Sequence, residues 1–175
     1  MTLEKHMEDT MKEWQIKIGS LDSGMRLYYP KSSLCDYMNL SRDIKNEALQ
    51  EHIEKYLASH AAHLGEVKIS HDSDRFCLYV GKAGCCYVEQ NIPEPEFLTR
   101  FLEALKLQNM DAVLKVFHDY AEGHGTEVCS EKEEDGIGTA LYFENEDLEP
   151  YVSCVEQNEF GITYHRFAKS DFGSL

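Results

Sequence analysis

The residues best suited to chemistry lie in the second half of the chain. His118 and Glu122 are four positions apart near the end of a predicted helix, and His124 follows directly in the loop. A histidine and a carboxylate at this spacing share one helix face, so they can transfer protons or hold a metal ion together. The same spacing is typical of a plain surface pair at a helix C-terminus, where a cationic histidine is favoured. Both interpretations stay open for this group.

A second group lies in the last predicted strand, "GITYHRF", which contains His165 and Arg166. Successive side chains of a strand point to opposite faces, so Tyr164 and Arg166 share one face while His165 lies on the other. An arginine in a polar cleft binds carboxylate or phosphate groups, but in this chain it can equally pair with one of the many surplus acids. The two groups together, five residues in all, form the candidate ligand-binding set.

None of the metal-binding patterns in the chain is complete. His60 and His63 share a predicted helix face, with His52 on the same helix, but no acidic or cysteine ligand is fixed beside them. The stretch "EKEEDG" resembles the first half of a calcium-binding loop, yet it starts with Glu131, and its twelfth position is Tyr142, which offers no bidentate carboxylate. We therefore predict no metal ion and no cofactor, and a solvated hairpin loop at the acidic stretch.

The stretch "GKAGCCYVEQ", residues 81–90, places Cys85 beside Cys86 after a glycine-bounded turn. It predicts a β-hairpin with "RFCLYV", in which the two thiols point to opposite sides of the sheet and cannot share a metal ion. No two of the six cysteines have the C-x₂-C spacing of structural zinc sites. We therefore expect six unligated thiols, most of them buried.

The charge of the chain limits its partners. Its 175 residues include 32 Asp and Glu against 17 Lys and Arg, a net charge of −15. Nucleic acids and anionic membranes are bound through basic surfaces, so we expect neither of them as a partner. Neither a signal peptide nor an apolar segment of membrane-spanning length is apparent, and we expect a cytoplasmic protein whose thiols stay reduced.

Apolar periodicity predicts a single α+β domain, with an antiparallel sheet of about five to seven strands and helices packed on it. In the first predicted helix, Leu3, Met7, Met11, Trp14 and Ile18 recur at spacings of three and four and form one apolar stripe. Short β segments joined by tight turns favour antiparallel pairing. The predicted segments are a mainly helical part (1–65), a β meander (66–90), a helix pair (94–122), a second β meander (126–167) and a frayed tail (168–175).

Two segments of the chain are "RLYYPKSSL", residues 26–34, and "EFGITYHRFAKSDF", residues 159–172. They resemble segments of an uncharacterised bacterial family that is known only as a domain of unknown function. The resemblance spans most of the chain and implies a stand-alone bacterial protein. It brings no catalytic residue, ligand or partner to this sequence.

Three functions are compatible with these observations. The first is a non-enzymatic acidic interaction or regulatory protein that binds a basic protein partner, favoured by the charge and by the lack of a nucleophile motif. The second is a small-ligand binder or enzyme whose cleft uses the candidate ligand-binding set. The third is a structural role, in which aromatic strands mediate dimerisation.

Overall fold

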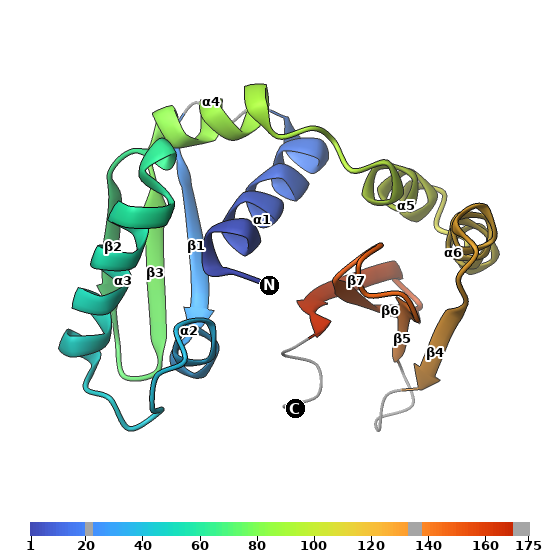
Figure 1. Ribbon diagram of the computed structural model, residues 1–175. Helices are drawn as coiled ribbons and strands as arrows, with labels where there is room; N and C mark the ends of the chain where they lie inside the picture. The colour runs from blue at the N-terminus through green and yellow to red at the C-terminus, as the bar shows by residue number, and fades with distance from the viewer. Residues whose placement is uncertain (20–22, 133–137, 170–175) are drawn as a thin grey trace. The chain divides into compact units, whose positions relative to one another are not determined.

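The computed structural model describes residues 1–19, 23–132 and 138–169. In these residues the chain forms six α-helices and seven strands, and the strands pair antiparallel in one sheet of three and one of four (Figure 1). The predicted α+β class and antiparallel pairing are confirmed. Contacts within the chain define two compact units, Met1–Glu94 and Pro95–Leu175, and each sheet belongs to one of them.

The first unit combines a three-stranded sheet with four helices. Its strands are β1 (Met25–Pro30), β2 (Val67–His71) and β3 (Arg75–Val80), in the spatial order β1-β3-β2. Its helices are α1 (Leu3–Ile18), α2 (Lys31–Tyr37), α3 (Asn46–His60) and α4 (Lys82–Asn91), with the 3₁₀ turn η1 (Ala62–Leu64) after α3.

The core of the first unit follows from the alternation of its strands and the apolar stripes of its helices. Leu27 of β1 and Phe76 and Leu78 of β3 are buried, while their neighbours in sequence are more exposed. In α1 the first three residues of the predicted stripe, Leu3, Met7 and Met11, have fully buried side chains. The stripe ends there, because Trp14 is 45% and Ile18 61% exposed. The last turns of α1 therefore add little to this core.

Residues 82–91 form helix α4 and not the second strand of the predicted hairpin. Cys85 and Val88 are buried three positions apart, on one helix face together with Gly84. Side chains of α1 bind the backbone of α4, since Gln15 Nε2 donates to the Cys85 carbonyl oxygen over 2.8 Å. The predicted β meander over 66–90 is therefore wrong in its last third, and β3 pairs with β1 and β2 instead.

The cysteines agree better with the prediction. All six are thiols without a disulfide, and Cys35, Cys85 and Cys154 are buried. Burial, with a smaller contribution from the neighbouring Cys86 thiol, raises the pKa of Cys85 above its ordinary value. Cys85 thus behaves as a small apolar residue of the core.

The second unit packs two helices on a four-stranded sheet. The helices are α5 (Glu96–Lys106) and α6 (Met110–His124). The strands are β4 (Val128–Lys132), β5 (Gly138–Phe143), β6 (Tyr151–Asn158) and β7 (Gly161–Ala168), in the order β4-β5-β6-β7. The predicted helix pair and the predicted second meander are both confirmed.

Aromatic rings join the helices of the second unit to its sheet. The ring of Phe143 on β5 lies 5.0 Å from that of Phe97 and 5.5 Å from that of Phe117, and Phe101 contacts Tyr164 of β7 at 5.0 Å. Edge-to-face and stacked pairs at these distances add to the stability that apolar burial provides. This aromatic core places β7, and with it His165 and Arg166, in a rigid sheet.

The hairpin between β6 and β7 has the tight turn that the sequence predicts. Gly161 takes a φ of 128°, which favours glycine, and its backbone leads directly into β7. Residues 133–137 of the acidic stretch and 170–175 of the predicted tail lie outside the described residues. Among the described residues, no helix is long and apolar enough to cross a membrane.

Candidate functional site

The candidate residues on α6 lie on its exposed side. His118 and Glu122 are both exposed, and neither of their side chains takes part in a hydrogen bond or ion pair within the described part of the chain. His124 is the last residue of α6, where its Nδ1 lies 2.8 Å from the Tyr120 carbonyl oxygen and its ring packs on the Tyr120 ring at 4.2 Å. His124 therefore binds its own helix and does not meet His118.

The candidate residues on β7 are separated by the sheet, as the alternation predicts. His165 is exposed, with its ring 6.3 Å from that of Phe167. Arg166 lies on the other face, where its side chain is 6% exposed and forms an ion pair with Glu149, which is 8% exposed. The guanidinium carbon also lies 3.7 Å from the centre of the Tyr151 ring. Arg166 is therefore a buried structural residue, which was the alternative that the sequence left open.

The five candidate residues are thus not joined into one site. No hydrogen bond or ion pair connects any two of them in the residues that the structure describes. Nor does any group of three His, Cys, Asp or Glu side chains in this part of the chain have the arrangement of a metal site. The geometry offers no acid–base pair to these residues, and their role as a ligand-binding set stays a prediction.

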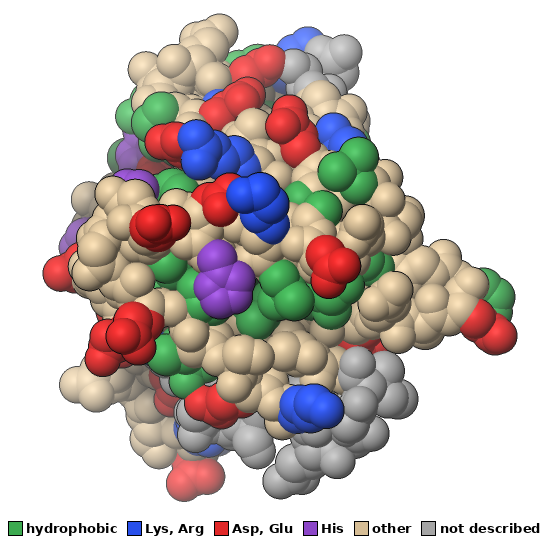
Figure 2. All heavy atoms as spheres, turned by 90° about the vertical axis from the view of Figure 1, so that its right-hand side faces the viewer, with side chains coloured by type: hydrophobic (Ala, Val, Ile, Leu, Met, Phe, Trp, Pro, Cys, Tyr) green, Lys and Arg blue, Asp and Glu red, His purple; other side chains and the backbone are tan. Residues whose placement is uncertain are grey.

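The second unit has a pronounced acidic character that the total charge conceals. Residues 95–175 contain 17 acidic and six basic residues, a net charge of −11, whereas residues 1–94 contain 15 and 11, a net charge of −4. Figure 2 looks at the side of the molecule where α6 and β4 lie in Figure 1, and acidic side chains clearly outnumber basic ones on it. The acidic excess is therefore concentrated in one unit.

Four residues with exposed carboxylates lie just before β4 and just after β5. The Glu144 backbone N–H donates to the Glu127 carbonyl oxygen over 3.0 Å, so these two residues extend the β4–β5 pairing by one step. The connection after β5 is ordered by Asn145, whose side-chain oxygen accepts the Asp147 N–H at 3.1 Å. We call the exposed residues Glu127, Glu144, Glu146 and Asp147 the acidic loop surface.

The first unit contains a different feature, a hollow of about 390 Å³ between the end of α2 and the outer side of α3. Tyr37, Met38 and Leu40 form its apolar wall, and His52, Lys55 and Tyr56 line it from α3. Asn39 completes the lining in a left-handed conformation with φ of 53°, which asparagine tolerates better than most residues. The hollow therefore offers apolar surface with one cation, Lys55, at its edge.

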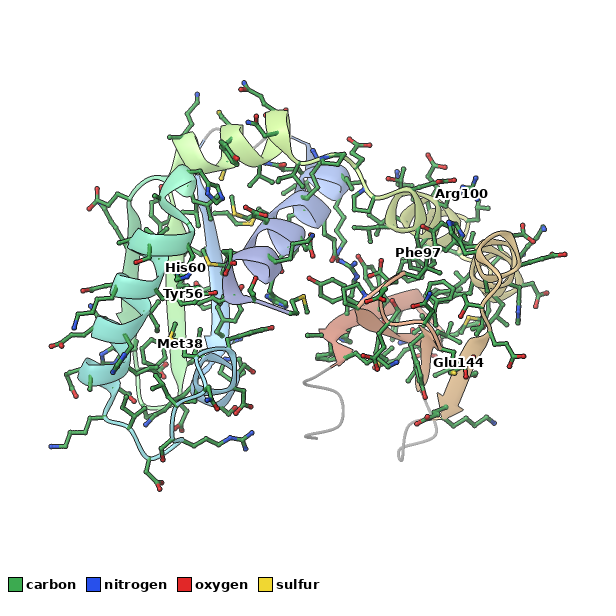
Figure 3. All side chains as sticks on the ribbon, viewed as in Figure 1. Met38, Tyr56, His60, Phe97, Arg100 and Glu144 are labelled. Carbon is green, nitrogen blue, oxygen red and sulfur yellow. The ribbon has the colours of Figure 1, made fainter. Side chains whose placement is uncertain are left out.

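Tyr56 lies next to His60 on α3 (Figure 3), and its pKa is shifted. Its hydroxyl donates to the Glu4 carboxylate, and its ring stacks on that of His60 with centres 4.4 Å apart. Burial, followed by the hydrogen bond to Glu4, raises the pKa of Tyr56 to about 12. Burial alone would raise the pKa of Glu4, but the hydrogen bonds it accepts, from Tyr56 first, lower it overall. Tyr56 is therefore a neutral donor, suited to binding and not to proton abstraction.

The three histidines that were predicted on one helix have different partners. His52 lines the hollow, His60 stacks on Tyr56, and His63 Nε2 lies 2.6 Å from Glu8 Oε1 with its ring against Tyr87. They separate because α3 ends at His60, so His63 belongs to the following 3₁₀ turn. The arrangement supports the solvated and paired roles over a shared metal.

Comparison with known families places the whole chain. Residues 1–175 match the family model described as "Domain of unknown function, E. rectale Gene description (DUF3877)". The chain belongs to the DUF3877 family. This confirms the resemblance seen in the two sequence segments. No curated protein and no solved structure matches the chain.

Membership of the DUF3877 family assigns no activity, so function must be argued from the residues themselves. The sequence did not predict the hollow, because its lining comes from the loop after α2 and from α3, which are brought together only by folding. The acidic loop surface has a local signal in "ENED", but its contact with Glu127 depends on the β4–β5 pairing. Both features need the fold before they can be recognised.

Proposed function

We propose that this protein is a non-enzymatic interaction protein whose acidic unit, residues 95–175, binds a basic protein partner. The observation that carries the proposal is the concentration of charge, with a net −11 in this unit against −4 in the other. Charges of one sign gathered on one surface steer an oppositely charged partner and raise its association rate. In the cytoplasm, which the free thiols favour, basic proteins are available as partners.

The acidic loop surface is the part of this unit best suited to such a contact. Its carboxylates are exposed and carried on a backbone that Asn145 and the β4–β5 pairing hold in place. Lys169 pairs with Glu146 at 3.0 Å, which leaves Glu127, Glu144 and Asp147 as the carboxylates to test. A preorganised set of charges loses little conformational entropy on binding.

The arrangement of the remaining polar groups supports binding over catalysis. Arg166 is paired with Glu149 inside the unit, His124 binds its own helix, and Tyr56 is held protonated in the other unit. Nucleophilic and acid–base catalysis require a reactive group within hydrogen-bond reach of its base. Among these three groups Tyr56 contacts such a base, the Glu4 carboxylate, and there its pKa is raised to about 12, so it stays protonated.

The proposal is tested by affinity capture from cells of the source organism at low and high salt. The bait is the wild-type chain, the variant E127Q/E144Q/D147N, or the control variant E47Q/E51Q/E54Q, which removes three exposed carboxylates from α3. We expect a basic protein that is retained by the wild type and the control at low salt, and lost from the acidic-loop variant. Equal capture by all three baits, or none by any, would contradict the proposal.

A second function is favoured by the hollow of the first unit. Its apolar wall and the nearby Lys55 suit a small molecule that combines an apolar body with a carboxylate or phosphate group. Nuclear magnetic resonance titration with a set of aromatic and aliphatic carboxylates would shift the backbone signals of residues 37–40 and 52–56. The variant Lys55→Met should weaken this binding, whereas the acidic-loop variant should leave it unchanged.

A further inference from the structure

One face of the three-stranded sheet of the first unit is open to solvent. The strands bury every second residue, so the alternate residues between them face outward. The register places Arg26 opposite Tyr79, and Tyr28 opposite Cys77, on this same side. We call this surface the open sheet face. Its members are Arg26, Tyr28 and Pro30 of β1, Lys68 and Ser70 of β2, and Arg75, Cys77 and Tyr79 of β3.

The open sheet face is basic in a strongly acidic protein. It holds three cations, Arg26, Lys68 and Arg75, all of them exposed, and none of its eight residues is acidic. Asp74 precedes Arg75 in sequence, but in the described residues it forms no ion pair with it. Asp72 lies in the β2–β3 turn, where it accepts the backbone N–H groups of Asp74 and Arg75. The face therefore has an unneutralised positive charge.

The cations of the open sheet face differ from other cations of the chain in their lack of ion pairs. Within the described ranges, none of the three cations forms an ion pair. Other cations of the chain do so, since Lys17 pairs with Glu13 at 2.8 Å and Lys115 with Asp119 at 2.7 Å. With carboxylates in nearly twofold excess over cations, three unpaired cations on one face are the opposite of what the composition predicts.

Aromatic rings lie among these cations. Tyr28 is 56% exposed, and the guanidinium of Arg75 lies over its ring at 5.2 Å, while that of Arg26 lies over Tyr79 at 5.6 Å. The Tyr79 hydroxyl is fixed by a hydrogen bond to the Ser23 carbonyl oxygen at 2.6 Å. A guanidinium that stacks on a ring keeps its N–H edge free for a phosphate or carboxylate. The face thus combines flat stacking surfaces with donors for anions.

We propose that the open sheet face binds a short stretch of single-stranded nucleic acid. Bases would stack on the planes that the Tyr28 and Tyr79 rings form with the guanidinium groups over them. Phosphates would be held by Lys68 and by the N–H edges of Arg26 and Arg75. Aromatic and arginine planes on an exposed sheet are the standard means of holding unstacked bases. Tyr28 and Tyr79 are diagonal neighbours on adjacent strands, with backbones roughly 7–8 Å apart, which successive unstacked nucleotides can bridge.

An acidic peptide fits this face less well than a nucleic acid. It would use the three cations but leave the stacking planes without a partner of matching shape. The total charge of −15 argues against a long polyanion, because the rest of the protein repels it. The proposal is therefore a local site for a few nucleotides, an exception to the expectation that the total charge sets. Three phosphate contacts predict that log K falls with log salt with a slope of about −2.

The test is fluorescence anisotropy with short labelled single-stranded RNA and DNA oligonucleotides and with a labelled oligoglutamate peptide. The sheet variant R26Q/K68Q/R75Q is compared with K45Q/K106Q/K132Q, which removes three exposed cations elsewhere. We expect the sheet variant to bind the oligonucleotides about tenfold or more weakly, and the control variant to bind like the wild type. Tyr28→Ala should weaken binding by roughly five- to one-hundred-fold through loss of stacking.

Each other result overturns the proposal. Absence of oligonucleotide binding at low salt, or an equal loss in both triple variants, would show that the face is no nucleic-acid site. Oligoglutamate binding as tight as that of the oligonucleotides, unchanged in Tyr28→Ala, would assign the face to an acidic peptide. A wild-type dimer in sedimentation that only the sheet variant dissociates would show that a second copy covers the face. Circular dichroism of every variant checks that it is folded.

Discussion

Arg166 of β7 and Glu149, two residues before β6, form an ion pair that is buried on both sides, with exposed side-chain fractions of 6% and 8%. The Arg166 guanidinium also lies over the Tyr151 ring. The free-energy cost of burying two charges is offset mainly by their mutual attraction. Removing one partner therefore leaves the other charge buried without a counterion. The pair therefore makes the two residues depend on each other.

The first prediction concerns this pair. Arg166→Met should lower the free energy of unfolding by about 3–5 kcal/mol, because the Glu149 carboxylate then lacks its counterion in a buried position. The double variant E149L/R166M should recover most of this loss, since two apolar side chains replace both charges. Urea denaturation of the wild type and the two variants measures the difference. Additive losses in the double variant would show that the two residues are not coupled.

The second prediction tests the packing of helix α4. It compares a substitution of Gly84 in α4 with the same substitution of Gly123 in α6. A Cβ on Gly84 would lie 2.5 Å from the Leu64 carbonyl oxygen, whereas one on Gly123 of α6 would meet nothing within 4 Å. Gly84→Ala should therefore destabilise the protein despite the better helix propensity of alanine, by about 1–3 kcal/mol. Gly123→Ala should stabilise it by about 0.5–1 kcal/mol. Thermal unfolding of both variants shows whether each substitution stabilises or destabilises the protein. A stabilising Gly84→Ala would contradict the close packing of α4 against Leu64.

The third prediction concerns the alkaline titration of Tyr56. Its pKa is raised from 10.0 to about 12, so the folded state favours the protonated phenol. The resulting stabilisation is complete below pH 10 and is lost as the pH rises from 10 to 12. After allowance for solvent screening we expect a contribution of about 1 kcal/mol. Tyr56→Phe should show a correspondingly smaller loss of stability over this range.

Phenolate absorbance provides an independent readout of the same group. Tyr142, whose hydroxyl donates to Glu131 over 2.5 Å, also has its pKa raised to about 12, chiefly by this hydrogen bond. Burial also raises the pKa of Tyr120, so Tyr56, Tyr142 and Tyr120 should ionise late in the folded protein. The double variant Y56F/Y142F should have a smaller late fraction than the wild type. A late fraction of unchanged size in that variant would assign it to other tyrosines.

Elements with a long local pattern could be predicted from the sequence. The helix pair over α5 and α6 follows from apolar spacing, and the β6–β7 hairpin follows from alternation and a turn with Gly161. In each of these cases the interactions that decide the structure lie close together in sequence. The family resemblance likewise rested on two continuous segments and is confirmed.

Elements fixed by distant contacts could not be predicted in the same way. The segment of α4 has β-compatible residues after two glycines, but the side chains of Gln15 and Lys12 of α1 bind its backbone in the helical form. Arg166 was recognised as a residue that binds an anion, yet only the fold identifies that anion as Glu149. The open sheet face escaped recognition because it requires β1 to pair with β3, roughly fifty residues further along the chain.

The fourth prediction is the kinetic form of the proposed function. A partner that is steered by the acidic loop surface should associate fast at low salt and lose this advantage as salt screens the charges. Neutralising Glu127, Glu144 and Asp147 should have the same effect as salt, while the control changes on α3 should not. Dissociation should change less than association, because exposed charges at the edge of an interface act mainly on the encounter.

The most direct test is therefore the association rate constant of the partner retained on the wild-type chain, measured by stopped flow against ionic strength. Steering by the acidic loop surface predicts that E127Q/E144Q/D147N lowers this rate about tenfold or more at low salt, and that E47Q/E51Q/E54Q, with the same total charge, leaves it close to the wild-type value. Equal rates for the two variants at every ionic strength would show that the acidic loop surface does not direct the encounter.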